Sequence, residues 1–135
     1  MPELAATLLA VFEGNAALSI GFIRHTETGT RFTYRKIRHP ASGYAVVGVA
    51  VAVRLQGDVV ASASIGVTGA AAHAFAGDAA TEFLIGKSLS PDAIAEAARL
   101  LGEATECLSD RYASAEYRAS LVATETRRAL LALAE

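Results

Sequence analysis

Two stretches of alternating large and small side chains, joined by a short turn, constrain the fold of this 135-residue chain most strongly. The first alternates Val47, Val49, Val51, Val53 and Leu55 with Gly48, Ala50 and Ala52, and the second alternates Val59, Ala61, Ala63, Ile65 and Val67 with Ser62, Ser64 and Gly66. A period of two predicts β-strands, and Gln56-Gly57-Asp58 predicts a hairpin turn between them. Neither face of this hairpin is strongly polar, so we expect both to be covered. The small face permits a helix or another subunit to come unusually close.

A basic segment precedes the hairpin and is expected to form an edge strand over residues 30–38. Alternation places Phe32 and Tyr34 on one face with Lys36 and Arg38, and Thr33 and Ile37 on the other. Five basic residues fall within fifteen positions and are opposed by Glu27 alone; they are Arg24, Arg31, Arg35, Lys36 and Arg38. Two interpretations stand at this point: charge that protects an edge strand from aggregation, or a surface that faces an anion or a partner.

The second half of the chain is expected to be helical. Residues 78–85 predict a helix stopped by Gly86, and Ser90-Pro91-Asp92 predicts the capped start of a helix that runs to about Leu108. Its expected buried stripe is Ile94, Ala97, Ala98, Leu101, Ala104 and Leu108. The last helix begins near Ser114, and its expected apolar members are Tyr117, Leu121, Val122, Ala129, Leu130 and Leu133.

Strands followed by segregated helices indicate an α+β domain, with an antiparallel sheet of three to four strands and about three helices packed on one face. At 53% hydrophobic residues, the chain has ample material for the core of a single domain. A short helix over residues 2–12 and a short strand over residues 18–23 are expected before it. We therefore divide the chain into an N-terminal extension, residues 1–29, and a domain formed by residues 30–135.

Charge and cysteine content exclude several classes of protein. The formal net charge of −2 argues against general binding to nucleic acid or to membrane surfaces. Cys107 is the single cysteine, which excludes an intrachain disulfide and favours a reducing compartment, so we expect a cytoplasmic protein. The apolar run at residues 5–12 lacks a basic segment before it and is not predicted to be a signal peptide.

No catalytic residue and no metal site are predicted. The three histidines, His25, His39 and His73, lack partners at the spacing of metal ligands. Cys107 is expected to be an inert, partly buried thiol in a helix, with its pKa raised by Glu103, Glu106 and Asp110. The glycines of residues 66–74 permit close approach to a ligand, but no phosphate-binding motif is present, and taken alone the segment favours a simple turn between sheet and helix.

Several short motifs, in a fixed order over about a hundred residues, resemble one known family. They are Tyr34-x-Lys36-x-Arg38 followed by Pro40-Ala41-Ser42-Gly43, the loop 69–76 after the hairpin, Ser114-Ala-Glu-Tyr-Arg118, and Arg127-Arg-Ala-Leu130. This pattern resembles the C-terminal domain of the FAD-carrying (medium) subunit of molybdenum hydroxylases of the carbon monoxide dehydrogenase and xanthine dehydrogenase type. The resemblance covers roughly residues 30 to 131. The chain departs from the family pattern at Ala76, near which an arginine is usual, and at Ser120, where a histidine is frequent.

The resemblance implies a role in electron transfer from a molybdenum centre, in which this domain helps to enclose FAD and docks partner subunits. The implied partners are an FAD-binding domain or subunit, an iron–sulfur subunit and a molybdopterin-containing large subunit. The residues it implies nearest the flavin or its partner domain are Lys36, Arg38, Ser42, Gly69 and His73. Because the family's FAD-binding domain is absent from the sequence, we expect the chain alone to bind FAD weakly or not at all. The alternative is a non-enzymatic, self-associating or partner-binding module that has lost the redox role.

Overall fold

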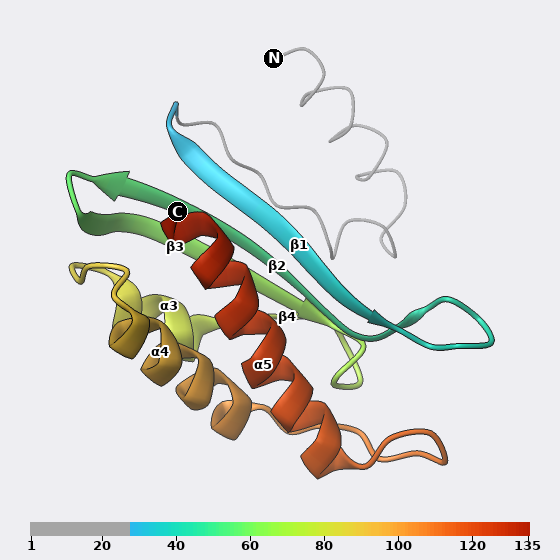
Figure 1. Cartoon of the computed structure of the whole chain (residues 1–135). Coiled ribbons are helices and arrows are strands. Elements are labelled where there is room, and N and C mark those ends of the chain that lie inside the picture. Colours follow the sequence, from blue (N-terminus) through green and yellow to red (C-terminus); the bar gives the residue numbers. More distant parts are fainter. Residues whose placement is uncertain (1–27) are drawn as a thin grey trace.

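The computed structural model describes residues 28–135, which form an antiparallel sheet and three helices (Figure 1). The four strands are β1 (Thr30–Arg38), β2 (Ala45–Gln56), β3 (Val59–Thr68) and β4 (Phe75–Ala76), in the order β1-β2-β3-β4 across the sheet. The helices are α3 (Asp78–Leu84), α4 (Pro91–Ala104) and α5 (Ala115–Ala134). This arrangement confirms the predicted α+β class. The helix and strand expected over residues 2–12 and 18–23 lie outside the described residues.

The bulky face of the hairpin forms the centre of the core. Val47, Val49 and Val51 of β2 are completely buried, and all three helices lie on their side of the sheet in Figure 1. The apolar residues that the helices contribute to the same cluster include Leu84, Ile94, Leu101, Val122 and Leu130. Burial of each such side chain contributes about 1.5–3 kcal/mol to folding. The alternation read from the sequence therefore positions the helical layer.

One strand departs from the predicted alternation. Val59, expected on the bulky face, is 41% exposed, whereas Val60 is buried. The pairing of β2 with β3 shifts between Arg54 and Leu55, so that Leu55 lies opposite Val60. An extra residue in one strand reverses which face the following side chains occupy. The predicted position of Val59 is therefore wrong, because a bulge interrupts the period of two.

The faces of β1 are as predicted, and the pairing with β2 fixes them. Phe32, Tyr34 and Lys36 lie opposite the small residues of β2, whereas Thr33 and Ile37 lie opposite valines. Two of the basic side chains lie on the helix side of the sheet. There Arg31 Nη1 donates to the backbone carbonyl of Leu133 at 2.9 Å, and Arg35 pairs with a carboxylate of α5. The charge of this strand therefore serves internal contacts as well as solvation.

Serine side chains cap the two long helices as expected. The Ser90 Oγ accepts from the backbone N–H of Ala93, and the Ser114 Oγ accepts from that of Tyr117. The end of α4 was wrongly predicted, because the helix stops at Ala104 and not near Leu108. The Leu108 N–H instead donates to the carbonyl of Ala70 at 2.8 Å, so the chain leaves the helix to bind another loop.

The buried stripes of the two long helices differ from expectation at three positions. Ala104 and Leu108 are exposed: Ala104 is the last residue of α4, and Leu108 lies beyond the helix and no longer follows its buried stripe. Tyr117 is exposed as well, since the next residue, Arg118, takes the buried position on α5.

The small-residue face of the sheet carries no helix among residues 28–135 (Figure 1). We use this name for the surface formed by Phe32, Tyr34 and Lys36 of β1, Gly48, Ala50 and Ala52 of β2, and Ser62, Ser64, Gly66 and Thr68 of β3. Phe32 and Tyr34 remain 61% and 55% exposed on it. The expectation that both faces are covered is therefore not met by the described part of the chain. No described helix is long and apolar enough to cross a membrane.

Candidate functional site

Three connections meet at one end of the sheet, and we call this region the loop end. They are the β1–β2 turn (39–44), the β3–β4 loop (69–74) and the α4–α5 segment (105–114). Antiparallel pairing brings the last residue of β1, the first residue of β2 and the last residue of β3 to the same end of the sheet. The loop end adjoins the small-residue face, since Lys36, Gly48 and Thr68 form one row across the sheet.

Hydrogen bonds to His39 fix the shape of the β1–β2 turn. Its Nδ1 accepts from the backbone N–H groups of Ala41 and Ser42 at 3.2 and 3.3 Å, and the backbone N–H of His39 donates to the Tyr44 carbonyl at 2.7 Å. The imidazole also meets the ring of Tyr112 edge to face, with the ring centroids 4.4 Å apart. The turn therefore contacts the α4–α5 segment directly, and His39 has a structural role there.

The β3–β4 loop begins at a glycine that no other residue can replace without strain. Gly69 has φ +81°, and a Cβ at this position would lie 2.7 Å from the carbonyl oxygen of Ala45 and 2.8 Å from that of Val46. Both the left-handed backbone and the contact with β2 require glycine. The start of this loop is consequently packed tightly against the start of β2.

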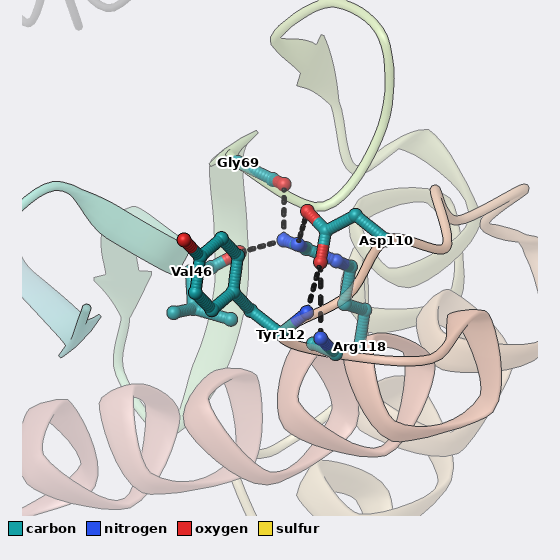
Figure 2. Close-up of polar contacts among 6 residues, drawn as sticks. Val46, Gly69, Asp110, Tyr112 and Arg118 are labelled. Carbon is teal, nitrogen blue, oxygen red and sulfur yellow. Dashed lines mark hydrogen bonds and ion pairs between the residues drawn. The ribbon is translucent and has the colours of Figure 1, made fainter. Parts of the chain in front are cut away.

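A buried arginine joins the segments of the loop end (Figure 2). One guanidinium nitrogen of Arg118, Nη1, donates to the carbonyls of Val46 at 2.9 Å and Gly69 at 3.0 Å. The other, Nη2, lies 2.6 Å from the carboxylate of Asp110. The second oxygen of Asp110 accepts from the backbone N–H groups of Tyr112 and Ala113. These backbone hydrogen bonds, together with Arg118, lower the pKa of Asp110.

A tyrosine ring lies on the small-residue face beside the loop end. The Tyr34 hydroxyl is 2.6 Å from the position that a Cβ on Gly48 would occupy, and the next ring atom is 3.2 Å from it. Glycine at position 48 therefore makes room for the ring to lie over β2. The result is a flat, half-exposed aromatic surface beside Lys36, which pairs with Gly48.

The structure places the five residues predicted from the sequence at the loop end or next to it. Arg38 and Ser42 lie at the β1–β2 turn, where an Arg38 guanidinium nitrogen is 3.5 Å from the Cβ position of Gly43. Lys36 shares a row with Thr68, the residue before Gly69. His73 is exposed in the β3–β4 loop. Their placement is compatible with one ligand-facing region, although whether they touch a cofactor stays a prediction.

Arg118 and Tyr34 were not among the site residues predicted from the sequence. Arg118 had a detectable signal, because Val122, Ala129 and Leu133 follow it at helical spacing and an arginine on such a buried stripe needs partners. Tyr34 had a weaker one, since its position over Gly48 depends on a pairing register that the sequence does not state.

The remaining candidate groups are the metal-ligating side chains and Cys107. Among residues 28–135, no cluster of three or more His, Cys, Asp or Glu side chains is placed to hold a metal ion. Cys107 is partly buried, and burial raises the pKa of its thiol, which Arg118 partly offsets. The predicted direction is therefore confirmed, but the cause is burial and not the neighbouring carboxylates. Cys107 also lies after the end of α4, so its predicted helical position is wrong.

Residues 32–133 match the family described as the CO dehydrogenase flavoprotein C-terminal domain. The chain is 31% identical over 103 residues to the carbon monoxide dehydrogenase medium chain of Afipia carboxidovorans, a match that covers 76% of this chain and 36% of that protein. The chain thus spans about a third of the length of this relative.

Solved structures of related enzymes share the fold. A carbon monoxide dehydrogenase from Hydrogenophaga pseudoflava superimposes with a TM-score of 0.75 at 28% identity, covering 82% of this chain and 38% of the other. Quinoline 2-oxidoreductase from Pseudomonas putida 86 gives a TM-score of 0.72 at 28% identity, covering 78% and 37%. The match of motifs, sequence and fold leads to one conclusion: this chain belongs to the CO dehydrogenase flavoprotein C-terminal domain family.

Proposed function

We propose that this domain helps to enclose FAD in a molybdenum hydroxylase, together with an FAD-binding domain supplied from outside the sequence described here. The observation that carries the proposal is the half-exposed ring of Tyr34, laid over Gly48 on a sheet face that no described helix covers. A flat ring system such as isoalloxazine stacks favourably on an aromatic side chain. Small neighbouring residues let such a ring approach the backbone closely.

Charge on the same side of the sheet supports an anionic ligand. The residues that define the small-residue face include Lys36 and no carboxylate, and Arg38 follows two positions later at the end of β1. FAD carries a negatively charged pyrophosphate, and reduction adds negative charge to the flavin. Cationic side chains favour both. We therefore retain Lys36, Arg38, Ser42, Gly69 and His73 as the proposed flavin-facing residues and add Tyr34.

In this proposal the chain itself transfers no atoms. FAD supplies the redox chemistry, and the side chains of this domain shield the flavin from water and stabilise its charge. The proposed partners are an FAD-binding domain or subunit, an iron–sulfur subunit and a molybdopterin-containing large subunit. A cytoplasmic location is part of the proposal, supported by the single, unpaired cysteine.

A domain exchange tests the proposal. Residues 30–135 replace the matching portion of the carbon monoxide dehydrogenase medium chain of Afipia carboxidovorans, and FAD content and flavin fluorescence are measured. We expect the hybrid to retain FAD with quenched fluorescence, and Tyr34→Ala to weaken quenching, whereas Thr33→Ala on the opposite face leaves it unchanged. A hybrid whose flavin behaves like that of the medium chain without any C-terminal portion would contradict the proposal.

The isolated chain provides a second test. We expect titration with FAD to show weak binding or none, because a single sheet face encloses at most one side of the flavin. Tight one-to-one binding by the chain alone would overturn the requirement for a second domain.

The second candidate function is self-association or partner binding without redox chemistry. It is favoured by the same exposed face, in particular by Phe32 next to Tyr34, since exposed aromatic side chains are enriched in protein interfaces. Light scattering after size exclusion distinguishes the two candidates. A stable dimer that Phe32→Lys dissociates, and that no flavoprotein domain displaces, would favour this function over FAD enclosure.

A further inference from the structure

We infer that Arg118 is a positioning residue, which holds the β3–β4 loop (69–74) in register with the start of β2 on the proposed flavin side of the domain. The inference rests on the proposed function for its biological meaning, but the contacts that carry it belong to the described chain alone. They are the hydrogen bonds from one guanidinium nitrogen to the carbonyls of Val46 and Gly69 (Figure 2).

The two carbonyls lie where regular strand pairing is interrupted, at Val46, or has ended, at Gly69. The register of β1 against β2 passes from Ile37–Val47 to Arg38–Ala45, so Val46 has no partner residue in β1. Gly69 follows the last residue of β3. Because a single Nη1 atom bonds both oxygens, it fixes the offset of the loop relative to the strand. The backbone of Gly69, with no side chain, allows the two segments to come this close.

The α4–α5 segment holds the same loop from a second direction. Asp110 orients the guanidinium, and its other oxygen is anchored by the backbone N–H groups of Tyr112 and Ala113. Two residues before Asp110, the N–H of Leu108 donates to the carbonyl of Ala70. Two consecutive loop carbonyls are thus held from neighbouring elements: that of Gly69 by Arg118 of α5, and that of Ala70 by Leu108 of the α4–α5 segment.

Core packing alone does not account for an arginine at this position. The residue is 6% exposed, and its Nε is buried without a hydrogen-bond partner in the described structure. A buried charge carries a desolvation cost, and apolar residues of similar volume frequently serve stability as well or better. Arginine is favoured where a planar fork must bind several acceptors in a fixed geometry. The contacts of Arg118 meet that description.

Substitution in the whole chain tests the positioning role directly. Arg118→Lys keeps the charge but replaces the planar fork with a point charge, and Val122→Ala, one turn further along the buried face of α5, weakens the core without touching the loop. Two readouts report on the loop: hydrogen exchange of the Leu108 N–H, which depends on the Ala70 carbonyl, and elastase cleavage within the alanine-rich residues 70–74.

We expect Arg118→Lys to raise the exchange rate of the Leu108 N–H and the rate of loop cleavage by about tenfold. Exchange of the buried strand amides should change much less, because only the loop opens. Val122→Ala should raise both readouts only in proportion to its loss of global stability in urea. The positioning role is wrong if Arg118→Lys leaves both readouts at the wild-type level. It is also wrong if Val122→Ala, compared at the same global stability as Arg118→Lys, raises both readouts as much as Arg118→Lys does.

The hybrid medium chain separates this inference from the proposed function. Failure of the wild-type hybrid to bind FAD counts against FAD enclosure, while the loop measurements in the chain alone still decide the role of Arg118. If the wild-type hybrid binds FAD, we expect Arg118→Lys to shift the visible absorption bands of the bound flavin, and Val122→Ala to leave them in place. A loosened loop with an unchanged flavin spectrum would show that the loop does not face the cofactor.

Discussion

Glu125 of α5 is buried and forms an ion pair with Arg35 of β1, with 3.0 Å between Glu125 Oε2 and Arg35 Nε. Its other oxygen, Oε1, lies 2.7 Å from Nη1 of Arg128, one turn further along the helix. Only 1% of the Glu125 side chain is exposed, whereas both arginines are roughly half exposed. The buried carboxylate thus fastens the last helix to the edge strand through Arg35, while Arg128 supplies a second cation from the helix itself.

The paired arginines should substitute for one another in neutralising Glu125. We expect Arg35→Met or Arg128→Met alone to lower the free energy of unfolding by about 1 kcal/mol, because the remaining arginine still pairs with the carboxylate. The double variant leaves a buried charge without a partner, which costs about 3–5 kcal/mol. Urea denaturation of the four proteins in this cycle measures the difference. Strictly additive effects would show that the two arginines act independently.

Gly69 should tolerate alanine much less well than the hairpin glycine does. Both Gly69 and Gly57 have positive φ, so alanine at either position costs about 1–2 kcal/mol in backbone strain. A Cβ on Gly57 meets nothing within 4 Å, whereas one on Gly69 meets two backbone carbonyls under 3 Å away. We therefore expect Gly69→Ala to lower the free energy of unfolding in urea by at least about 2 kcal/mol more than Gly57→Ala. Equal losses would contradict the close packing of the loop against β2.

Alanine at Gly48 should separate stability from flavin contact. The clashing atoms belong to two side chains, Tyr34 and Thr68, which can move, and alanine suits a strand better than glycine by about 0.5–1 kcal/mol. We expect Gly48→Ala to leave the chain's stability near the wild-type value but to displace the Tyr34 ring. In the hybrid medium chain, flavin fluorescence should then rise toward the level of Tyr34→Ala.

Unchanged quenching in the Gly48→Ala hybrid would show that the position of the ring over β2 is unimportant for the flavin. Gly66→Ala serves as the matched control, because it adds the same methyl group to the same face at a position where a Cβ meets nothing within 4 Å.

Local periodicity was sufficient to predict most of the fold. The valines of β2 alternate without interruption, and Ser90 and Ser114 cap their helices through hydrogen bonds that involve residues three positions away. The bulge that exposes Val59 and buries Val60 was not predictable in this way, because it is a property of two strands in register. The early end of α4 has the same origin, since Leu108 leaves the helix for a carbonyl 38 positions earlier, that of Ala70.

The candidate site was predicted in part, by resemblance and not by local pattern. Residues of the β1–β2 turn and the β3–β4 loop do lie at one end of the sheet, as antiparallel pairing requires. What joins them is Arg118, whose contacts reach 72 and 49 positions back along the chain to Val46 and Gly69. The helical spacing of Arg118 with Val122 predicts that Arg118 is buried. The sequence alone does not predict which carbonyls the buried guanidinium binds.

The pH dependence of stability should show the contribution of Asp110. Backbone N–H groups of Tyr112 and Ala113, and then Arg118, stabilise its ionised form and lower its pKa in the folded chain. In the unfolded chain an aspartate titrates near its ordinary pKa of about 3.9. The folded state therefore binds this proton less readily, so the stabilisation is complete above that value and is lost as the pH falls through the lower folded pKa. We expect the urea midpoints of wild type and Asp110→Asn to differ by a constant amount between about pH 5 and 7, and to converge below about pH 4. A difference that persists unchanged into strong acid would mean that the carboxylate's charge, and hence its pairing with Arg118, contributes nothing to holding the loop end together.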